Sequence, residues 1–320
     1  MHSQIFCVAL PQEIMSMKKV FLLILAFLAV APLRAQQDNA GLSPLFNPAV
    51  RAELPKEVRE TSGLFFHNGR LWTHNDSGGK PILYALDTVT FQVVQRITIT
   101  NGKNKDWEDV CTDGTTVFVG DMGNNKGKRN HLRIYMFQLS DIPDEGDAGV
   151  TVDSIVFRFA DQTNFEKRKV HDFDCEALFA TEQHLYLLSK GWATGTTRLY
   201  RLPKTPGEHV AEVVNSFDSK GLVTGADYDP ENRLLAVVGY AKNKAFEPFI
   251  YLIFNFDEHG KNLANHRFEM PNHAGTQTEG ICFFDKGKCY VSAEATPVFS
   301  ARVFVMDFTK WIEAQRKEDK

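Results

Sequence analysis

Five short phrases recur along the chain at similar intervals, and they constrain its fold more than any other feature. Each places an oxygen-bearing residue beside a small or acidic residue and then enters an apolar run. They are Glu60-Thr-Ser-Gly-Leu64, Asp106-Trp-Glu-Asp-Val110, Asp174-Cys-Glu-Ala-Leu178, Val223-Thr-Gly-Ala-Asp227 and Thr278-Glu-Gly-Ile281. Counted from Ser62, Glu108, Glu176, Thr224 and Glu279, the steps are about 46, 68, 48 and 55 residues. A period near 50 residues with strand-like content is the mark of a β-propeller.

The segments between the phrases are short β-rich runs that alternate with turn signals, and almost none has helical periodicity. The first unit contains four such runs, at 64–66, 71–73, 82–85 and 91–99, and the later units repeat this pattern. The last unit is one strand short, and 49–54 is a strand candidate without a unit of its own. We therefore predict an all-β, five-bladed propeller that this N-terminal strand closes, because closure removes an exposed sheet edge. A six-bladed propeller is the alternative and would need a further unit.

Strand direction brings the phrases together on one face. Successive antiparallel strands reverse direction, so the start of each inner strand lies on the same face as the loop between the second and third strands. On this basis one face carries the five oxygen-bearing residues. The loops expected on the same face are 75–79, 120–130, 190–197, 240–247 and 293–300.

Three carboxylates that face one axis need a compensating charge. At about 5 Å and an effective dielectric near 20, each pair repels by about 3 kcal/mol, so either some are protonated or a cation lies among them. Oxygen ligands favour Ca²⁺ over softer metals. The predicted metal ligands are Ser62, Glu108, Glu176, Thr224 and Glu279. The alternative, in which the acids bond to backbone amides at the channel mouth, stays open.

Two loops on this face are candidates for binding and catalysis. The loop 121–129 combines exposed backbone amides with three cations, which suits phosphate or another anion, although Gly-Asn-Lys loops are also ordinary turns. The loop 75–79 is similarly either a turn or a site. Asp76 and Asp109 are the candidate catalytic acids. The candidate substrate-binding residues are Asn75, Asn124, Asn125, Lys126, Lys128 and Arg129.

The N-terminus has the features of an export signal. Lys18-Lys19 precede an apolar run at 20–32 that is too short to span a bilayer comfortably. We predict a signal peptide at 1–35 (its start possibly Met15 or Met17), a linker at 36–45, one propeller domain at 46–310 and a charged tail at 311–320. The mature protein is then periplasmic or secreted, without a membrane span.

Net charge and cysteine content limit the possible functions further. The net charge of −4 gives no global basic field, so nucleic acid is not an expected partner. After signal cleavage Cys111, Cys175, Cys282 and Cys289 remain. An exported chain permits disulfides, and the sequence leaves open whether these residues pair or stay buried thiols.

Several motifs carry a resemblance to known proteins. Asn-Asp-Ser-Gly-Gly, Asp-Trp-Glu-Asp, Gly-Asp-Met-Gly-Asn-Asn and Asp-Cys-Glu-Ala resemble a group of exported bacterial propellers without an established activity, over nearly the whole mature chain. The pattern is also remotely similar to the calcium-activated apyrases, five-bladed propellers with a central Ca²⁺ that hydrolyse nucleoside di- and triphosphates.

The apyrase resemblance supports a central calcium site more strongly than it supports nucleotide hydrolysis. It places Ser62, Glu108, Glu176, Thr224 and Glu279 at the calcium-binding phrases, with Thr224 where that family has Ser. Gly63 stands where the family has a further Glu. The segment 75–78 replaces an Asp-Asp-Arg-Thr-like loop, and the missing Arg argues against nucleotide hydrolysis.

Two functions follow from these observations. The first is a monomeric binding module, in which calcium rigidifies the blades and the loops bind a small anionic ligand, a glycan or a protein. The second is a calcium-dependent hydrolase of phosphoanhydrides or phosphoesters, in which the metal polarises a phosphoryl oxygen. We favour the first because propellers host many functions.

Overall fold

The computed structural model describes residues 45–241, 246–261, 263 and 266–319. These residues belong to one compact unit, Ser43–Lys320. The predicted signal peptide at 1–35 and nearly all of the predicted linker at 36–45 lie outside the described residues.

Strands make up nearly all the regular structure of the described residues. In chain order they are β1 (Val50–Glu53), β2 (Thr61–His67), β3 (Arg70–Asn75), β4 (Ile82–Asp87), β5 (Val93–Ile99), β6 (Trp107–Thr112), β7 (Thr116–Asp121), β8 (Leu132–Gln138), β9 (Ala148–Val150), β10 (Asp153–Phe159), β11 (Asp174–Ala180), β12 (His184–Lys190), β13 (Thr196–Pro203), β14 (Gly207–Asp218), β15 (Leu222–Asp229), β16 (Leu234–Ala241), β17 (Glu247–Ile253), β18 (His266–Glu269), β19 (Thr278–Asp285), β20 (Lys288–Ala293) and β21 (Arg302–Asp307). The helices are η1 (Lys56–Val58), η2 (Leu139–Asp141), η3 (Pro271–His273) and α1 (Thr309–Glu318).

Consecutive strands pair in antiparallel meanders. Two sheets run in the orders β2-β3-β4-β5-β9 and β15-β16-β17-β18, and a third runs β1-β21-β20-β19. The eight-stranded sheet joins two meanders, β6-β7-β8-β10 and β11-β12-β13-β14, through a parallel pair between β10 and β14. A second parallel pair joins β5 and β9. The sequence did not predict either parallel pair, because both form at outer edges where no phrase recurs.

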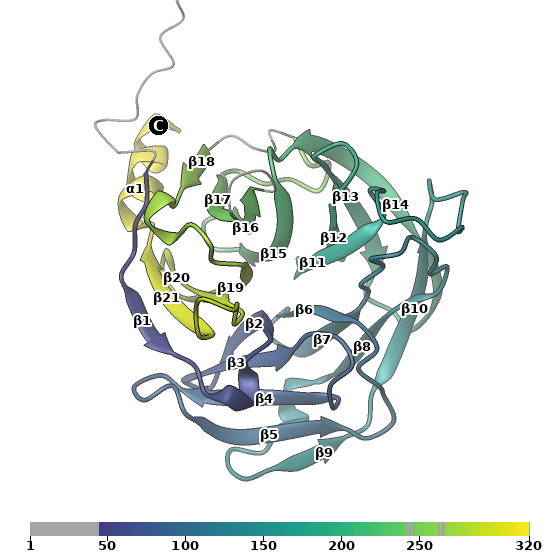
Figure 1. Ribbon diagram of the computed structural model, residues 1–320, viewed down its shortest axis with the longest axis horizontal. Coiled ribbons are helices and arrows are strands. Elements are labelled where there is room, and N and C mark those ends of the chain that lie inside the picture. Colours follow the sequence, from purple (N-terminus) through teal and green to yellow (C-terminus); the bar gives the residue numbers. More distant parts are fainter. Residues whose placement is uncertain (1–44, 242–245, 262, 264–265, 320) are drawn as a thin grey trace, which may run out of the picture. The chain divides into compact units, whose positions relative to one another are not determined.

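The first strands of the meanders lie around a common centre (Figure 1). β2 contacts β6, β6 contacts β11, β11 contacts β15, β15 contacts β19, and β19 contacts β2 again. We call these five the inner strands. The described residues therefore form a nearly all-β, propeller-like arrangement, as predicted.

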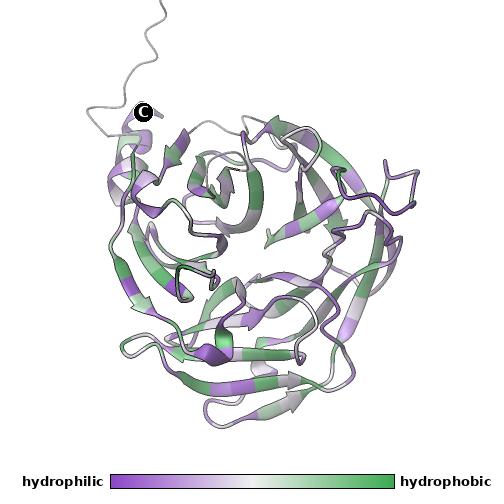
Figure 2. Cartoon of the chain, viewed as in Figure 1, coloured by the Kyte–Doolittle hydropathy of each residue, from purple (hydrophilic) through white to green (hydrophobic). Residues whose placement is uncertain are grey.

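Burial follows the distance of a strand from this centre. All seven residues of the inner strand β11 are buried, whereas the outer strand β10 alternates between buried and exposed positions. Figure 2 shows that hydrophobic and hydrophilic residues both occur along the strands. An inner strand faces neighbouring sheets on both sides, so it needs apolar residues on both faces, while an outer strand needs them on one.

The hydrophobic core is divided among the interfaces between neighbouring sheets. One cluster joins β2–β5 to β6–β8, and another joins β2–β4 to β19–β21, at the two ends of the chain. Cross-strand aromatic pairs recur inside the sheets: Phe65 stacks on Trp72 at 5.6 Å, and Phe179 stacks on Tyr186 at 5.1 Å. Such pairs add about 0.5–1.5 kcal/mol each beyond the area they bury.

The two ends of the described chain both pack on the last meander. β1 pairs antiparallel with β21, with Ala52 opposite Val303. The predicted charged tail forms most of α1, in which Ile312 is buried. Phe46 contacts the rings of Phe308 and Trp311 at 5.5 and 5.6 Å.

Candidate functional site

The five predicted metal-ligating residues occupy equivalent positions in the fold. Each lies where an inner strand shifts register against its second strand, which marks a β-bulge or irregularity. These residues, which we call the ring residues, are Ser62, Glu108, Glu176, Thr224 and Glu279. A bulge leaves one residue unpaired in the ladder and re-aims its side chain. The recurrent phrases are therefore recurrent bulges at the amino ends of the inner strands.

The two ring hydroxyls bind to neighbouring strands. Ser62 Oγ donates to the Glu108 carbonyl oxygen at 2.5 Å, and Thr224 Oγ1 donates to the Thr278 carbonyl oxygen at 2.6 Å. Each bond joins one inner strand to the next. The hydroxyls thus stabilise the arrangement of the strands, and the carboxylates are the groups left for other chemistry.

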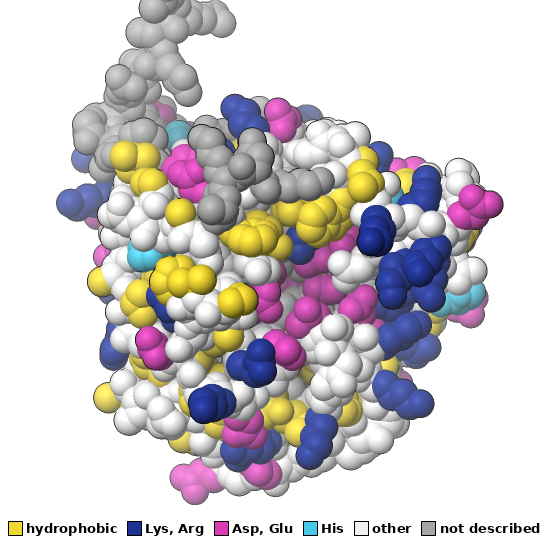
Figure 3. Space-filling view, in the orientation of Figure 1, with side chains coloured by type: hydrophobic (Ala, Val, Ile, Leu, Met, Phe, Trp, Pro, Cys, Tyr) yellow, Lys and Arg dark blue, Asp and Glu magenta, His cyan; other side chains and the backbone are white. Residues whose placement is uncertain are grey.

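A cavity of about 320 Å³ opens among the ring residues. We call it the acidic cavity, since carboxylates outnumber every other charged group in its wall. Its lining residues are Glu60, Thr61, Ser62, Asp76, Glu108, Asn125, Glu176, Lys190, Trp192, Tyr240, Phe246, Gln277, Glu279 and Glu294. Figure 3 shows Asp and Glu side chains gathered at the centre of this face, with Lys and Arg side chains beside them. Four ring residues line the cavity, and Thr224 does not.

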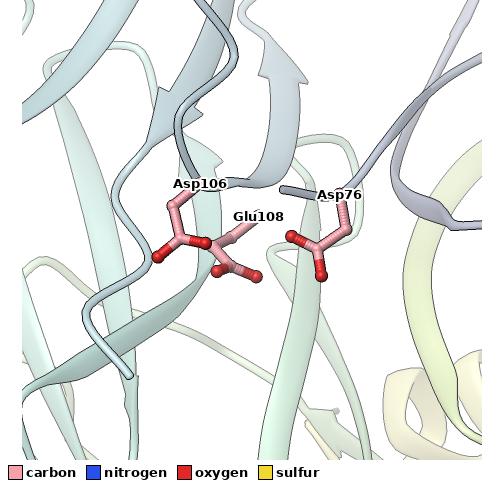
Figure 4. A group of neighbouring side chains, drawn as sticks. All are labelled: Asp76, Asp106 and Glu108. Atoms are coloured by element: carbon pink, nitrogen blue, oxygen red, sulfur yellow. The ribbon is translucent and has the colours of Figure 1, made fainter. Parts of the chain in front are cut away.

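Three carboxylates at one side of the cavity lie close together. One carboxylate oxygen from each of Asp76, Asp106 and Glu108 lies within 4.8 Å of the other two (Figure 4), and Asp76 and Glu108 line the cavity. Asp76 follows β3, Asp106 precedes β6, and Glu108 belongs to β6. A Cβ at Gly123 would lie 1.9 Å from Glu108 Oε1 and 2.6 Å from Asp106 Oδ2. A side chain at position 123 would therefore displace these two carboxylates from the positions they hold beside the loop.

Burial and mutual repulsion disfavour ionisation of this group. Burial, followed by the charge of Asp76, raises the pKa of Asp106 to about 6, against the lowering effect of Arg129. Burial, followed by the charge of Glu176, raises the pKa of Glu108 well above its usual value. The pKa of Asp76 is also raised by burial. Protons or a bound cation would relieve this repulsion.

The other side of the cavity already holds a cation. Lys190 Nζ lies 3.0 Å from Glu176 Oε2, and both side chains are buried. The same ammonium lies 5.5 Å from the Trp192 ring centre and 5.4 Å from that of Tyr240. Burial alone would lower the pKa of Lys190, but Glu176, Tyr240 and Glu279 raise it well above its usual value. Lys190 therefore neutralises the Glu176 side of the cavity, and no recurrent phrase in the sequence marks this lysine.

Asp109 does not line the acidic cavity, although Asp76 does. Asp109 is fully buried, and its Oδ2 accepts hydrogen bonds from Leu178 N at 2.8 Å and Ala226 N at 3.4 Å. Its Oδ1 accepts a bond from Val110 N. This carboxylate joins the inner strands β6, β11 and β15 through hydrogen bonds from their backbone. Of the two predicted catalytic acids, only Asp76 therefore lines the acidic cavity.

Three of the predicted substrate-binding residues have partners within the fold. Asn75 accepts a bond from Glu60 N and donates one to the Glu57 carbonyl oxygen. The buried Asn124 donates to Asp174 through its backbone and to the Phe173 carbonyl oxygen through its side chain. Arg129 forms an ion pair with Asp121 at 2.9 Å.

The remaining three predicted substrate-binding residues are accessible. Asn125, Lys126 and Lys128 are exposed, and Asn125 lines the acidic cavity. Their loop is held by segment 160–172: Arg168 N donates to the Lys126 carbonyl oxygen at 2.9 Å, and Gln162 Nε2 donates to the Gly127 carbonyl oxygen at 2.8 Å.

The four cysteines that follow the predicted signal peptide are buried free thiols in the part of the chain that the structure describes. Burial raises the pKa of each of them well above its usual value. Cys289 lies opposite Phe283, and Cys282 lies opposite Tyr290, so the two residues do not face each other across the hairpin.

Within the described residues, no helix is long and apolar enough to cross a membrane. No known family profile matches the chain, and no curated protein matches its sequence.

Solved structures match the chain weakly. A glucose dehydrogenase structure is 10% identical, covers 81% of this chain and 99% of its own, and has a TM-score of 0.47. The WD40 domain of Toxoplasma gondii coronin is 12% identical over 82% and 74% of the two chains, with a TM-score of 0.38. Kuenenia stuttgartiensis hydrazine synthase is 14% identical over 80% and 67%, also with a TM-score of 0.38. These similarities are too weak to define the fold, which follows from the pairing of the strands.

Proposed function

We propose that the protein is an exported, monomeric, five-bladed β-propeller that binds calcium in the acidic cavity and uses the surrounding loops to bind a small anionic ligand or glycan. The observation that carries the proposal is the group Asp76, Asp106 and Glu108, from each of which one carboxylate oxygen lies within 4.8 Å of the other two, and of which Asp76 and Glu108 line a solvent-accessible cavity. The signal-like N-terminal sequence supports export.

The strand pairing supports five blades and their closure by β1. The eight-stranded sheet divides at the parallel β10–β14 pair into two meanders of four strands. Each of the other three sheets then supplies one meander, and β1 is the fourth strand of the last one. Each meander contributes one inner strand, and the contacts among these strands return from β19 to β2.

The donor set supports calcium at Asp76, Asp106 and Glu108 rather than on an axis through all five ring residues. These three residues supply six hard carboxylate oxygens, and Ca²⁺ takes six to eight oxygen ligands in flexible geometry. Glu176 pairs closely with Lys190 at 3.0 Å, whereas Arg129 lies 4.0 Å from Asp106, and the Ser62 and Thr224 hydroxyls bind neighbouring strands. Calcium bound here would supply positive charge and open coordination positions for ligand oxygens.

The cavity wall supports a ligand as well as a metal. Trp192, Tyr240 and Phe246 also line the acidic cavity, and ligand pockets are commonly lined by aromatic side chains of this kind. The exposed Lys126 and Lys128 follow the lining residue Asn125. An anionic ligand that contacts the calcium would meet these lysines at the rim.

Isothermal titration with Ca²⁺ after EDTA treatment tests the metal site. We expect saturable binding and a rise in melting temperature, because a ligand that binds only the folded state stabilises it. Glu108→Gln and Asp106→Asn should each weaken binding by about tenfold or more, since each removes a charged ligand. The exposed Glu182→Gln is the matched control and should leave the affinity unchanged. Equal calcium binding in all four proteins would refute this site.

The hydrolase remains the second candidate because Asp76 lies beside the proposed metal and two exposed lysines follow Asn125. Phosphate release from a panel of nucleotides and phosphoesters, with and without Ca²⁺, separates the two functions. Calcium-dependent release that Asp76→Asn abolishes would favour the hydrolase. Calcium binding without phosphate release would favour the binding module.

A further inference from the structure

A second cavity, of about 410 Å³, lies at the other ends of the inner strands. We call it the opposite cavity. It is lined by Phe65, Phe66, Thr112, Asp227, Tyr228, Asp229, Pro230, Glu231, Phe283, Phe284, Asp285 and Lys286. These residues belong to the carboxyl ends of β2, β6, β15 and β19 and to the turns that follow, whereas the acidic cavity opens at the amino ends. Asp227 comes three residues after Thr224 in β15, which is about 10 Å along a strand.

Aromatic side chains form much of the wall of the opposite cavity. Phe66, Tyr228, Phe283 and Phe284 are all only partly buried there. The rings of Phe66 and Phe284 lie 5.9 Å apart, and Phe284 stacks on Tyr290 at 4.2 Å. These rings are therefore held in place by packing while part of their surface stays accessible to a ligand.

The charge of the opposite cavity is negative. Four carboxylates line it, of which Glu231 pairs with Lys286 at 3.1 Å and Asp285 pairs with Lys288 at 3.0 Å. Asp227 has no ion-pair partner among the described residues, and burial raises its pKa to about 7. A cationic ligand would supply the missing charge beside this carboxylate.

The carboxylate oxygens are nevertheless largely occupied by hydrogen bonds. Asp227 accepts bonds from Tyr228 N at 2.9 Å and Phe283 N at 2.8 Å. Asp229 accepts a bond from Glu231 N at 2.9 Å, and Asp285 accepts one from Lys286 N at 2.8 Å. A primary ammonium carries three N–H donors that need acceptors, whereas an alkylated ammonium needs only charge and contact surface. The cavity therefore suits the alkylated group better.

We propose that the opposite cavity binds a quaternary ammonium group, which the accessible aromatic faces contact while Asp227 provides the opposite charge. Aromatic rings attract such cations through their negative faces. The volume lies within the range of sites for small organic ligands. This site is independent of the proposed calcium site, because the two cavities share no lining residue.

Titration of the full-length protein with choline in the presence of EDTA tests the proposal. The neutral isostere 3,3-dimethyl-1-butanol is the matched probe, since it has the same shape without the charge. We expect saturable choline binding with a millimolar dissociation constant, and binding of the isostere at least about tenfold weaker. The chelator removes calcium, so this result does not depend on the acidic cavity.

Two variants assign the binding to the cavity. Asp227→Asn should weaken choline binding by about tenfold and leave isostere binding unchanged. Phe66→Leu keeps the apolar volume, removes one aromatic face and should weaken choline binding by about threefold or more.

Glu313→Gln and Phe165→Leu are controls outside the cavity and should bind choline like the unmodified protein. The proposal is overturned if choline and its isostere bind equally, if no saturation occurs below about 50 mM choline, or if both cavity variants bind choline normally.

Discussion

Single glycines set the distance between the inner strands. Gly63, Gly225 and Gly280 each follow a ring residue directly in the sequence. A Cβ at these positions would lie 2.3 Å from Val110 N, 2.4 Å from the Glu279 carbonyl oxygen and 2.2 Å from the Ser62 carbonyl oxygen, respectively. These contacts are with backbone atoms, which cannot move aside as a flexible side chain can. The glycine in three of the five recurrent phrases is therefore a packing requirement of the neighbouring strand.

Gly280→Ala should lower the free energy of unfolding by about 1–3 kcal/mol, the usual cost of overpacking a close contact. Urea-induced unfolding measures the change. Gly79→Ala is the control, because the nearest atom to its Cβ would be 3.8 Å away and its φ is not in the left-handed region. Equal stability of the two variants would show that the strands can separate without cost.

Lys190 and Glu176 form a buried ion pair. Removal of one partner should therefore cost more stability than removal of both. Lys190→Met should destabilise the calcium-free protein by about 3–5 kcal/mol at neutral pH, because Glu176 then stays buried without a counter-charge. The double variant Lys190→Met/Glu176→Gln should recover most of this loss. Urea-induced unfolding in EDTA gives both values. No recovery in the double variant would mean that Lys190 acts through its ring contacts alone.

The carboxylates of the site could be predicted from the sequence more readily than their partners. Glu108, Glu176 and Glu279 repeat within recognisable phrases, so their convergence followed from strand direction. Lys190 lies 14 residues after Glu176 at the end of a second strand, and no repeat marks it. The grouping of Asp76 with Asp106 and Glu108 depends on how a loop folds over the neighbouring strand, which the spacing does not encode.

At the scale of elements, the bulges explain why the repeat was visible in the sequence. A bulge needs an unpaired residue and close backbone approach, so it restricts residue type at the same place in each inner strand. The outer strands carry no such restriction, and β9 and the parallel β10–β14 pair were not predicted. Segment 160–172 lies within the longest step between phrases, and it packs on the 121–129 loop through backbone and side-chain hydrogen bonds.

The strand β1 leads to a prediction about the edge of the last meander. A chain that begins at Pro55 lacks β1 and Phe46, and it loses the buried Leu54, whose N donates to the Ala301 carbonyl oxygen at 2.7 Å. We expect its free energy of unfolding to fall by at least about 2 kcal/mol, from lost apolar burial alone. A chain that begins at Ser43 is the control.

The shortened chain should also self-associate, because removal of β1 leaves the β21 edge unpaired. Sedimentation velocity over a range of concentrations detects this association. A monomeric chain of unchanged stability would show that β21 needs no partner strand and would argue against closure of the propeller by β1.

At the scale of the whole molecule, the two cavities concentrate negative charge at both ends of the inner strands. The net charge of the chain is only −4, so this concentration is local and is offset by cations elsewhere on the surface. Between the cavities, Asp109 contacts several inner strands through hydrogen bonds to their backbone. A cation bound in the acidic cavity would therefore affect stability beyond one sheet, since the groups it neutralises belong to two neighbouring meanders, Asp76 to the first and Asp106 and Glu108 to the second.

This linkage predicts how calcium and pH act together. Burial raises the pKa of Glu279 to about 8, of Glu294 to about 7 and of Asp106 to about 6. A carboxyl whose pKa is higher in the folded state than in the unfolded state stabilises the fold fully below its unfolded pKa and loses that contribution as pH rises through the folded value. The melting temperature of the calcium-free protein should therefore fall between pH 5 and pH 8. At Asp106, a ligand of the proposed site, calcium replaces the lost proton, so its stabilising effect should be larger at pH 8 than at pH 5, and scanning calorimetry at both pH values measures the difference. In Glu108→Gln the calcium effect should be small at both pH values, whereas an equal effect in the unmodified protein at pH 5 and pH 8 would separate the metal from these carboxylates.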